Sequence, residues 1–150
     1  MNPLRAFLTR RKNAPRPKRT GRHHHDLHAL FAAQQAHFSS PIEAQVKWGR
    51  WPTNRPRHSL RLGSCTPKTP PVIRIHPVLD HPEVPAWFVA FVLFHEMLHV
   101  AIPPEAGTKR RRVHTRRFRA AERAHPDYAR AMAWEKTHVR HLIQRVAATF

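Results

Sequence analysis

The first periodic segment of the chain is a stripe that begins just after Asp26. Its positions recur every three or four residues, the spacing of one face of an α-helix: Leu27, Leu30, Phe31, Gln34 and Phe38. Asp26 is a suitable N-cap, because its carboxylate can accept a hydrogen bond from an amide of the first turn. A Ser-Pro pair at residues 40–41 ends the pattern. We therefore expect an amphipathic helix that starts at Asp26.

Three short segments then have the pattern of β-strands. Residues 42–48 alternate apolar with polar side chains, residues 59–63 alternate around two leucines, and residues 72–75 are rich in β-branched side chains. Proline-rich turns separate them. We expect a small antiparallel sheet of about three strands. Residues 72–75 are the expected edge, along which an extended substrate could pair.

The most apolar segment of the chain covers residues 84–102. Its interruptions are Pro85, His95, Glu96 and His99. A helix that is apolar on nearly every side must be buried. The longest uninterrupted run, residues 86–94, falls well short of the roughly 20 residues that span a bilayer. The segment therefore predicts a core helix.

Two further helices are expected after this segment. The first covers residues 112–124, with Val113 and Phe118 as inward-facing candidates. The second covers residues 127–148, and its apolar positions are Met132, Val139, Leu142, Ile143 and Val146. Helices grouped around a small sheet predict a domain of the α+β class.

The charge of the chain points to a polyanionic partner. Lys and Arg number 27 against nine Asp and Glu, which gives a net charge of +18. Residues 1–22 hold no acid and read as a disordered basic arm, and a second basic block covers residues 109–119. Neither forms the basic amphipathic helix of a membrane-surface protein, so we expect no membrane partner. The candidate nucleic-acid contacts are Arg10, Arg11, Lys12, Arg110, Arg111 and Arg112.

The interruptions of the core helix form the motif His95-Glu96-Met97-Leu98-His99. Four residues turn an α-helix through about 400°, so both imidazoles leave the same face and can bind one Zn²⁺. Glu96 is displaced by about 100° and can reach a water on the metal, as a general base must. Burying these groups without partners would be costly, and a metal relieves that cost. A single cysteine excludes a Cys-based zinc site.

A catalytic zinc needs a third protein ligand and an open position. The metzincin extension requires Gly and His where this chain has Ile102 and Glu105, which excludes that class. His114 lies at the start of the next expected helix, and Glu122 lies eight residues further on. Glu105 follows two prolines in a turn that we expect to face solvent. The spacing leaves His114 and Glu122 open as the third ligand.

Several short motifs follow one another in a characteristic order along residues 26–125. They are an L-H-A-L-F helix, a V-x-W strand, L-G-S-C, I-R-I-H-P-x-L-D, the H-E-M-L-H helix and H-T-x-x-F. This order resembles the SprT-like zinc metalloprotease domain, a family with DNA-dependent members. The resemblance implies a small zincin-like fold with Zn²⁺ held by His95, His99 and His114 and with Glu96 as catalytic base, and it favours His114 over Glu122. The chain departs from the family in lacking a Cys-rich zinc ribbon and in having Thr115 where Gly often follows the third His.

These features predict a zinc-dependent metallopeptidase of the cytoplasm or nucleoid, brought to DNA-bound protein by its basic surface. The alternatives are a nucleic-acid-binding protein with a structural, non-hydrolytic zinc site, and a zincin acting on a non-protein substrate such as RNA. We divide the chain into the arm of residues 1–22 and an SprT-like domain over residues 23–150, which ends in the helix of residues 127–148. Nothing in the sequence indicates an oligomeric state.

Overall fold

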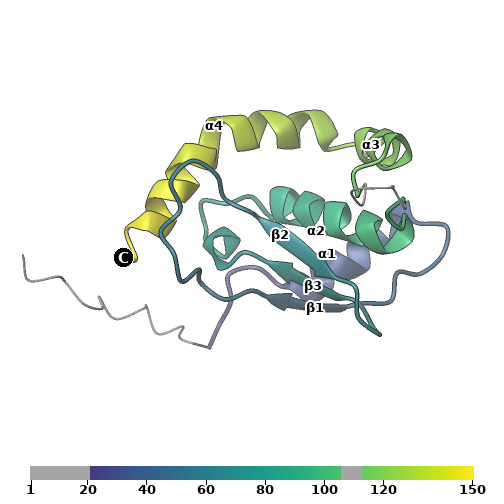
Figure 1. Ribbon diagram of the computed structural model, residues 1–150, viewed down its shortest axis with the longest axis horizontal. Coiled ribbons are helices and arrows are strands. Elements are labelled where there is room, and N and C mark those ends of the chain that lie inside the picture. Colours follow the sequence, from purple (N-terminus) through teal and green to yellow (C-terminus); the bar gives the residue numbers. More distant parts are fainter. Residues whose placement is uncertain (1–20, 106–112) are drawn as a thin grey trace, which may run out of the picture.

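The computed structural model describes residues 21–105 and 113–150, and it has an α+β fold as predicted (Figure 1). In chain order the elements are α1 (Leu27–Gln34), the 3₁₀ turn η1 (Gln35–His37), β1 (Gln45–Trp48), β2 (Gly63–Thr66), β3 (Val72–Ile75), the 3₁₀ turn η2 (Pro77–Leu79), α2 (Ala86–Ala101), α3 (Arg116–Arg123) and α4 (Tyr128–Ala147). Most of the expected arm (residues 1–20) and residues 106–112 lie outside this description. None of the described helices is long and apolar enough to cross a membrane.

The three strands form a mixed sheet, not the antiparallel sheet that we expected. Their order is β1-β3-β2, with β1 parallel and β2 antiparallel to β3. The short proline-rich turn between β2 and β3 makes these two antiparallel neighbours. The long connection of residues 49–62 carries the chain past the place that β3 fills, so β3 can pair with β1 on its other side. The strand predicted at the edge is therefore central, and β2 is an edge strand.

The second strand also starts later than its alternating pattern suggests. We expected residues 59–63, whereas β2 covers Gly63–Thr66 and pairs Gly63 with Ile75 of β3. Leu62 is buried in the core although it precedes the strand. The alternating pattern identifies residues 59–63 as an extended, half-buried segment. Hydrogen bonding to a neighbouring strand begins only at Gly63, where β3 lies opposite.

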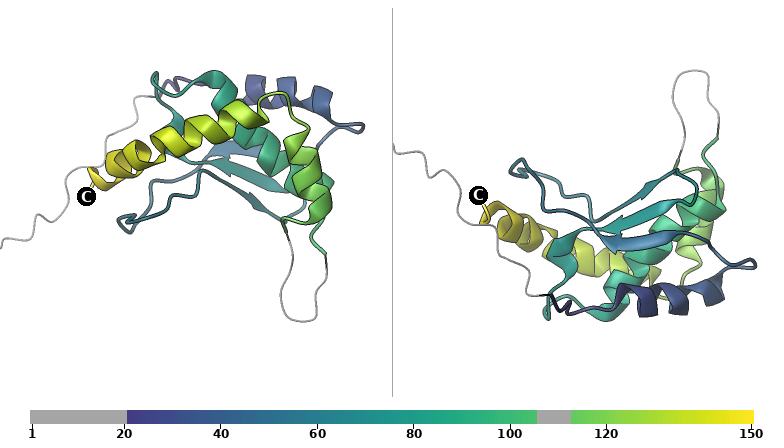
Figure 2. Two further views of the ribbon diagram at one scale, coloured as in Figure 1. Left: turned by 90° about the horizontal axis from the view of Figure 1, so that it is seen from above. Right: turned by 90° about the horizontal axis from the view of Figure 1, so that it is seen from below.

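The register gives the sheet two different faces. One face carries Val46, Cys65, Ile73 and Ile75, and α1 and α2 pack against it (Figure 2). The other face carries Lys47, Ser64, Thr66 and Arg74. Because successive side chains of a strand point to opposite sides, the core side is apolar, whereas the outer side is mainly polar and basic and includes one buried apolar residue, Val72.

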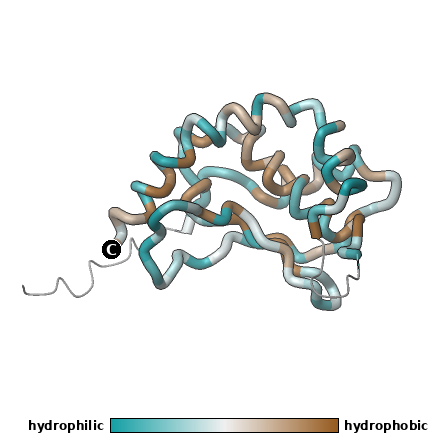
Figure 3. Tube along the Cα trace, turned by 45° about the horizontal axis from the view of Figure 1, so that its top comes forward, coloured by the Kyte–Doolittle hydropathy of each residue, from teal (hydrophilic) through white to brown (hydrophobic). Residues whose placement is uncertain are grey.

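Helix α2 is the centre of the core, as its sequence predicts. Phe88, Val89, Leu93 and Met97 are at most 1% exposed. The hydrophobic stretch of α2 lies between the sheet and α4 (Figure 3). Helix α4 supplies Leu142 and Val146, two of the apolar positions noted in its sequence, to the same core. Burial of this helix from several sides is the main apolar contribution to the fold.

The two flanking helices begin at their caps. Asp26 accepts a hydrogen bond from the amide of Ala29 and starts α1, as predicted. Helix α3 starts at Arg116, later than expected, because the hydroxyl of Thr115 accepts a hydrogen bond from the amide of Phe118 and caps it there. Val113 precedes this cap and is 41% exposed, so its inward placement was wrong, whereas Phe118 is fully buried.

The strand order predicts a specific pattern of amide hydrogen exchange. All four amides of β3 should be protected, because a central strand donates alternately to both neighbours. In β2 the amides of Gly63 and Cys65 should exchange quickly, because they point to the free edge. Exchange measured by NMR would contradict this topology if alternate amides of β3 exchanged as fast as those two.

Candidate metal centre

Helix α2 and the segment before α3 bring three histidines together. His95 and His99 lie one turn apart on α2, and their Nε2 atoms are 3.3 Å apart. The Nε2 atom of His114 is also 3.3 Å from that of His95. Each ring offers one nitrogen to a common point, with these atoms all within 4.8 Å of one another. The three residues could therefore hold one metal ion.

The ring of Phe118 packs against all three imidazoles. Its ring centroid is 5.1 Å from that of His95, 4.6 Å from that of His99 and 5.0 Å from that of His114. Because Phe118 is fully buried and lies in the first turn of α3, it locks this helix against α2. The cap residue Thr115 directly follows His114 and thereby places that histidine at the helix entrance.

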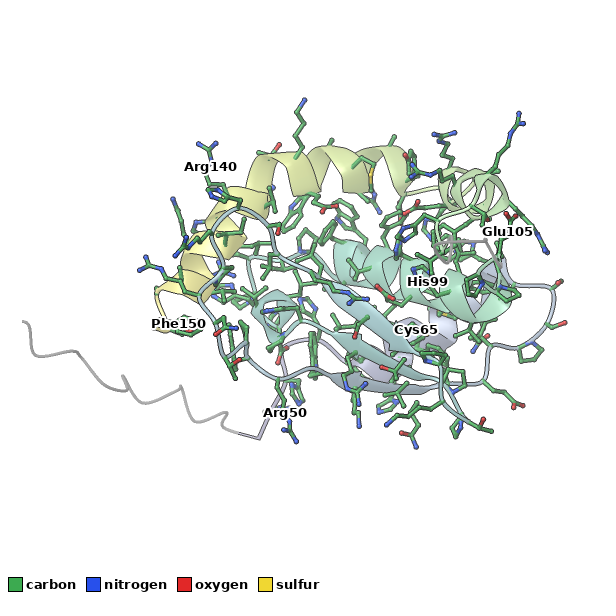
Figure 4. All side chains as sticks on the ribbon, viewed as in Figure 1. Arg50, Cys65, His99, Glu105, Arg140 and Phe150 are labelled. Atoms are coloured by element: carbon green, nitrogen blue, oxygen red, sulfur yellow. The ribbon has the colours of Figure 1, made fainter. Side chains whose placement is uncertain are left out.

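Glu122 contacts the histidine cluster through Nδ1 of His95, the ring nitrogen that does not face the other two histidines. Its Oε1 atom is 2.8 Å from Nδ1 of His95. A carboxylate at Nδ1 holds that nitrogen protonated and leaves Nε2 free to bind a cation. The group of three possible ligands contains His114 and not Glu122. Glu105, the other candidate, is exposed and does not line the site (Figure 4).

The electrostatics of the cluster suit a cation bound by neutral imidazoles. Burial, together with the charges of His95 and His114, lowers the pKa of His99 to about 4. Burial and the charge of His95 also lower the pKa of His114. For His95, burial lowers the pKa, but the hydrogen bond with Glu122 and nearby carboxylates outweigh it and raise the value. Two of the three rings thus keep a free lone pair at neutral pH, as metal ligands must.

Glu96 lies between the histidines and the edge strand, and it is 5% exposed. Burial raises the pKa of its carboxyl, and the charges of His95 and Arg61 oppose this only in part. Gly63 of β2 faces it so closely that an added Cβ would lie 2.7 Å from Oε1. Only glycine leaves the carboxylate in this position. A glycine inside a strand signals such a close approach, although we did not assign it this role from sequence.

The site opens into a cleft of about 370 Å³ between the edge-strand side and α4. The polar groups around it are Arg61, His95, Glu96, His99, His114, Glu122 and Glu135. The apolar groups are Leu60, Leu62, Phe88, Phe91, Val92 and Met132. Arg61 and Glu135 were missed from sequence, because they come from a loop and from a distant helix with no motif around them.

Cations gather on the outer face of the sheet and at its end. Arg50, Arg61 and Arg74 line one pocket of about 170 Å³ together with Ser64, and Lys47 is paired in register with Arg74. We call Lys47, Arg50, Arg61 and Arg74 the basic sheet face. None of them forms an ion pair within the described part of the chain. The predicted contacts Arg10, Arg11, Lys12 and Arg110 to Arg112 lie outside the described residues.

The geometry predicts how the protein binds Zn²⁺ when candidate ligands are changed one at a time. His114→Ala should abolish stoichiometric binding, because it removes one of three converging nitrogens. Glu122→Gln should keep one site but weaken it about 10–100-fold, because it changes only the partner of His95. Glu105→Gln is the matched control and should bind as wild type in a competition titration. Full-affinity binding by His114→Ala would contradict the assignment.

Comparison of the chain with protein-family models, curated proteins and solved structures finds no match. Its functional interpretation therefore depends on the site itself. Two histidines of α2, a third from the segment before α3, a buried glutamate beside them and an adjoining cleft make a candidate metal centre with room for a ligand.

Proposed function

We propose that the protein is a zinc-dependent metallopeptidase that its basic surface recruits to nucleic acid or to protein bound there. The observation that carries the proposal is the buried carboxylate of Glu96 beside three converging imidazoles at the wall of a cleft. The histidines fit zinc, because all-nitrogen sites with an open position are typical of catalytic Zn²⁺. A SprT-like, zincin-type fold is part of the same proposal.

Glu96 is the base in this proposal. A bound zinc ion would act as a Lewis acid that polarises the scissile carbonyl and lowers the pKa of water to about 7. Glu96 takes the proton of the attacking water and returns it to the leaving amine. Its raised pKa makes it a better proton acceptor than an exposed glutamate. Gly63 keeps the carboxylate in place by leaving it the room it needs.

The edge of β2 is the surface along which an extended substrate would bind. β2 has β3 on one side and no described strand on the other. Its first residue, Gly63, lies against Glu96 and lines the cleft. A peptide that adds to this edge gains main-chain hydrogen bonds and passes beside the histidines. This assigns to β2 the role that we had expected of residues 72–75.

Recruitment to nucleic acid is supported by the basic sheet face. Lys47 and Arg74 are paired in register on one face, where Arg74 also donates a hydrogen bond to the hydroxyl of Thr66. Like charges paired in this way repel each other, and a bound anion would relieve that repulsion. Arginines without an acidic partner are typical of phosphate recognition. Arg61 belongs both to this face and to the cleft. A phosphate backbone on this face would bring its bound proteins close to the candidate site.

The alternative is a nucleic-acid-binding protein whose zinc site is structural and not hydrolytic. Such sites are closed and four-coordinate. Here the described residues supply only three converging ligands. A structural site also has no use for a buried Glu96 beside the cluster. These observations favour the hydrolase.

The peptidase proposal predicts the behaviour of two variants. Glu96→Gln should bind zinc as wild type but lose at least about 10²-fold in cleavage of a DNA-bound protein, because it removes the base.

Gly63→Ala should have a free energy of unfolding within about 1 kcal/mol of that of the wild type, because only the flexible side chain of Glu96 must shift. Its cleavage rate should nevertheless fall about 10²-fold, because the added methyl group displaces the carboxylate of Glu96. Ser64→Ala is the matched control in the same strand. Full cleavage by the zinc-loaded Glu96→Gln protein would refute the proposal.

The basic sheet face predicts salt-dependent binding of DNA. Affinity measured by fluorescence anisotropy should fall steeply with salt. Changing both Arg50 and Arg74 to Ser should weaken binding and reduce the slope of log K against log salt by about 1–2, since each phosphate contact contributes about 0.9. Arg140→Ser on α4, at the other side of the molecule in Figure 4, is the control. Equal effects of the double variant and the control would exclude this face.

A further inference from the structure

Glu135 is a half-buried acidic residue on the inward face of α4. Ala131, Leu142 and Val146 follow one another at helical spacing and are at most 1% exposed. Glu135 lies four residues after Ala131 and seven before Leu142, so it belongs to the same inward face. Its side chain lines the cleft of the candidate metal centre. The core of the fold gains nothing from a carboxylate at this position.

The carboxylate of Glu135 also has no bonding partner in the part of the chain that the structure describes. It makes no hydrogen bond or ion pair with the described residues, whereas Glu122 in the same cleft bonds to His95. Burial, opposed only in part by the charge of His95, raises the pKa of Glu135. A half-buried acid with a perturbed pKa in a cleft is a candidate functional group.

Apolar side chains make up much of the cleft that Glu135 lines, although the charges of His95 and Glu122 also act on its carboxylate. These apolar side chains are Phe88, Phe91 and Val92 of α2 and Met132 of α4. Lys and Arg side chains are complementary to such a wall with a carboxylate at its end, because each has a long apolar stem and a cationic head. The stem can lie along the aromatic and aliphatic wall while the head reaches the carboxylate.

We propose that this part of the cleft is a specificity pocket for a Lys or Arg side chain of the substrate, with Glu135 as its anchor; this rests on the proposed peptidase function. A peptide along the edge of β2 has α4 across the cleft, and its side chains point alternately to either side. One of them enters the space between α2 and α4. Proteins bound to nucleic acid are rich in Lys and Arg, so such a pocket suits the substrates that the basic sheet face would bring.

The test measures peptide binding without hydrolysis. The full chain with the Glu96→Gln change, loaded with Zn²⁺, is titrated with fluorescent alanine-rich peptides that carry Lys, Met or Glu at one central position. The Lys peptide should bind about tenfold more tightly than the Met peptide, because a hydrogen-bonded ion pair replaces an apolar contact. Adding Glu135→Gln should remove this preference and leave the affinity for the Met peptide unchanged.

Three controls separate the pocket from other roles of Glu135. Glu43→Gln removes the same charge at an exposed position outside the cleft and should leave the preference intact. Zinc affinity should be unchanged in Glu135→Gln, unlike in Glu122→Gln. The melting temperature should not fall, because the change relieves a buried charge.

Several results would overturn the inference. They are equal binding of the Lys and Met peptides, loss of the preference in Glu43→Gln, or weakened zinc binding in Glu135→Gln. The readout is independent of catalysis. A zinc-loaded wild-type protein that cleaves neither these peptides nor a DNA-bound protein would refute the peptidase function, while the Lys preference and its loss in Glu135→Gln would still decide the role of the pocket.

Discussion

Helix α2 carries a buried glutamate and two half-buried histidines at the side of a hydrophobic core, and the neighbouring elements are arranged around these polar groups. Aliphatic and aromatic burial on most of the helix stabilises the fold. The remaining side has to satisfy polar groups that are removed from water. Glu122 partners His95, His114 completes the nitrogen cluster, and Phe118 fills the space beneath the rings. Gly63 leaves room for the carboxylate of Glu96.

Charge is distributed in an unusual way over this strongly basic chain. Only nine residues are acidic, and three of them, Glu96, Glu122 and Glu135, line one cleft. The outer face of the sheet carries cations that form no ion pair with residues 21–105 or 113–150. A cationic exterior attracts polyanions, whereas the acidic cleft suits a metal ion and basic side chains. Arg61 lines both the cleft and the pocket on the basic sheet face, so a ligand bound on that face lies next to the cleft.

Local sequence signals predicted some elements well and others poorly. The cap at Asp26 and the apolar length of α2 depend on neighbouring residues, and both are present where expected. The predicted antiparallel pairing and the edge position of residues 72–75 were wrong, because strand pairing is decided by contacts between distant residues and by the path of residues 49–62. Val113 was misplaced, because the cap at Thr115 starts α3 beyond it. Glu122 could be ranked as a ligand by spacing, but only the fold shows its hydrogen bond to Nδ1 of His95.

By itself, the sequence determined the chemistry available to this protein. The spacing of His95, Glu96 and His99 on one buried helix, the lack of a second cysteine and the excess of Lys and Arg all follow from the order of residues. Only the tertiary structure decided where the remaining parts lie. It brought His114 to the other two histidines, set Gly63 against Glu96 and directed Glu135 into the same cleft. The physical reason is that helical periodicity acts over a few residues, whereas these contacts depend on how α2, α3, α4 and the sheet pack together.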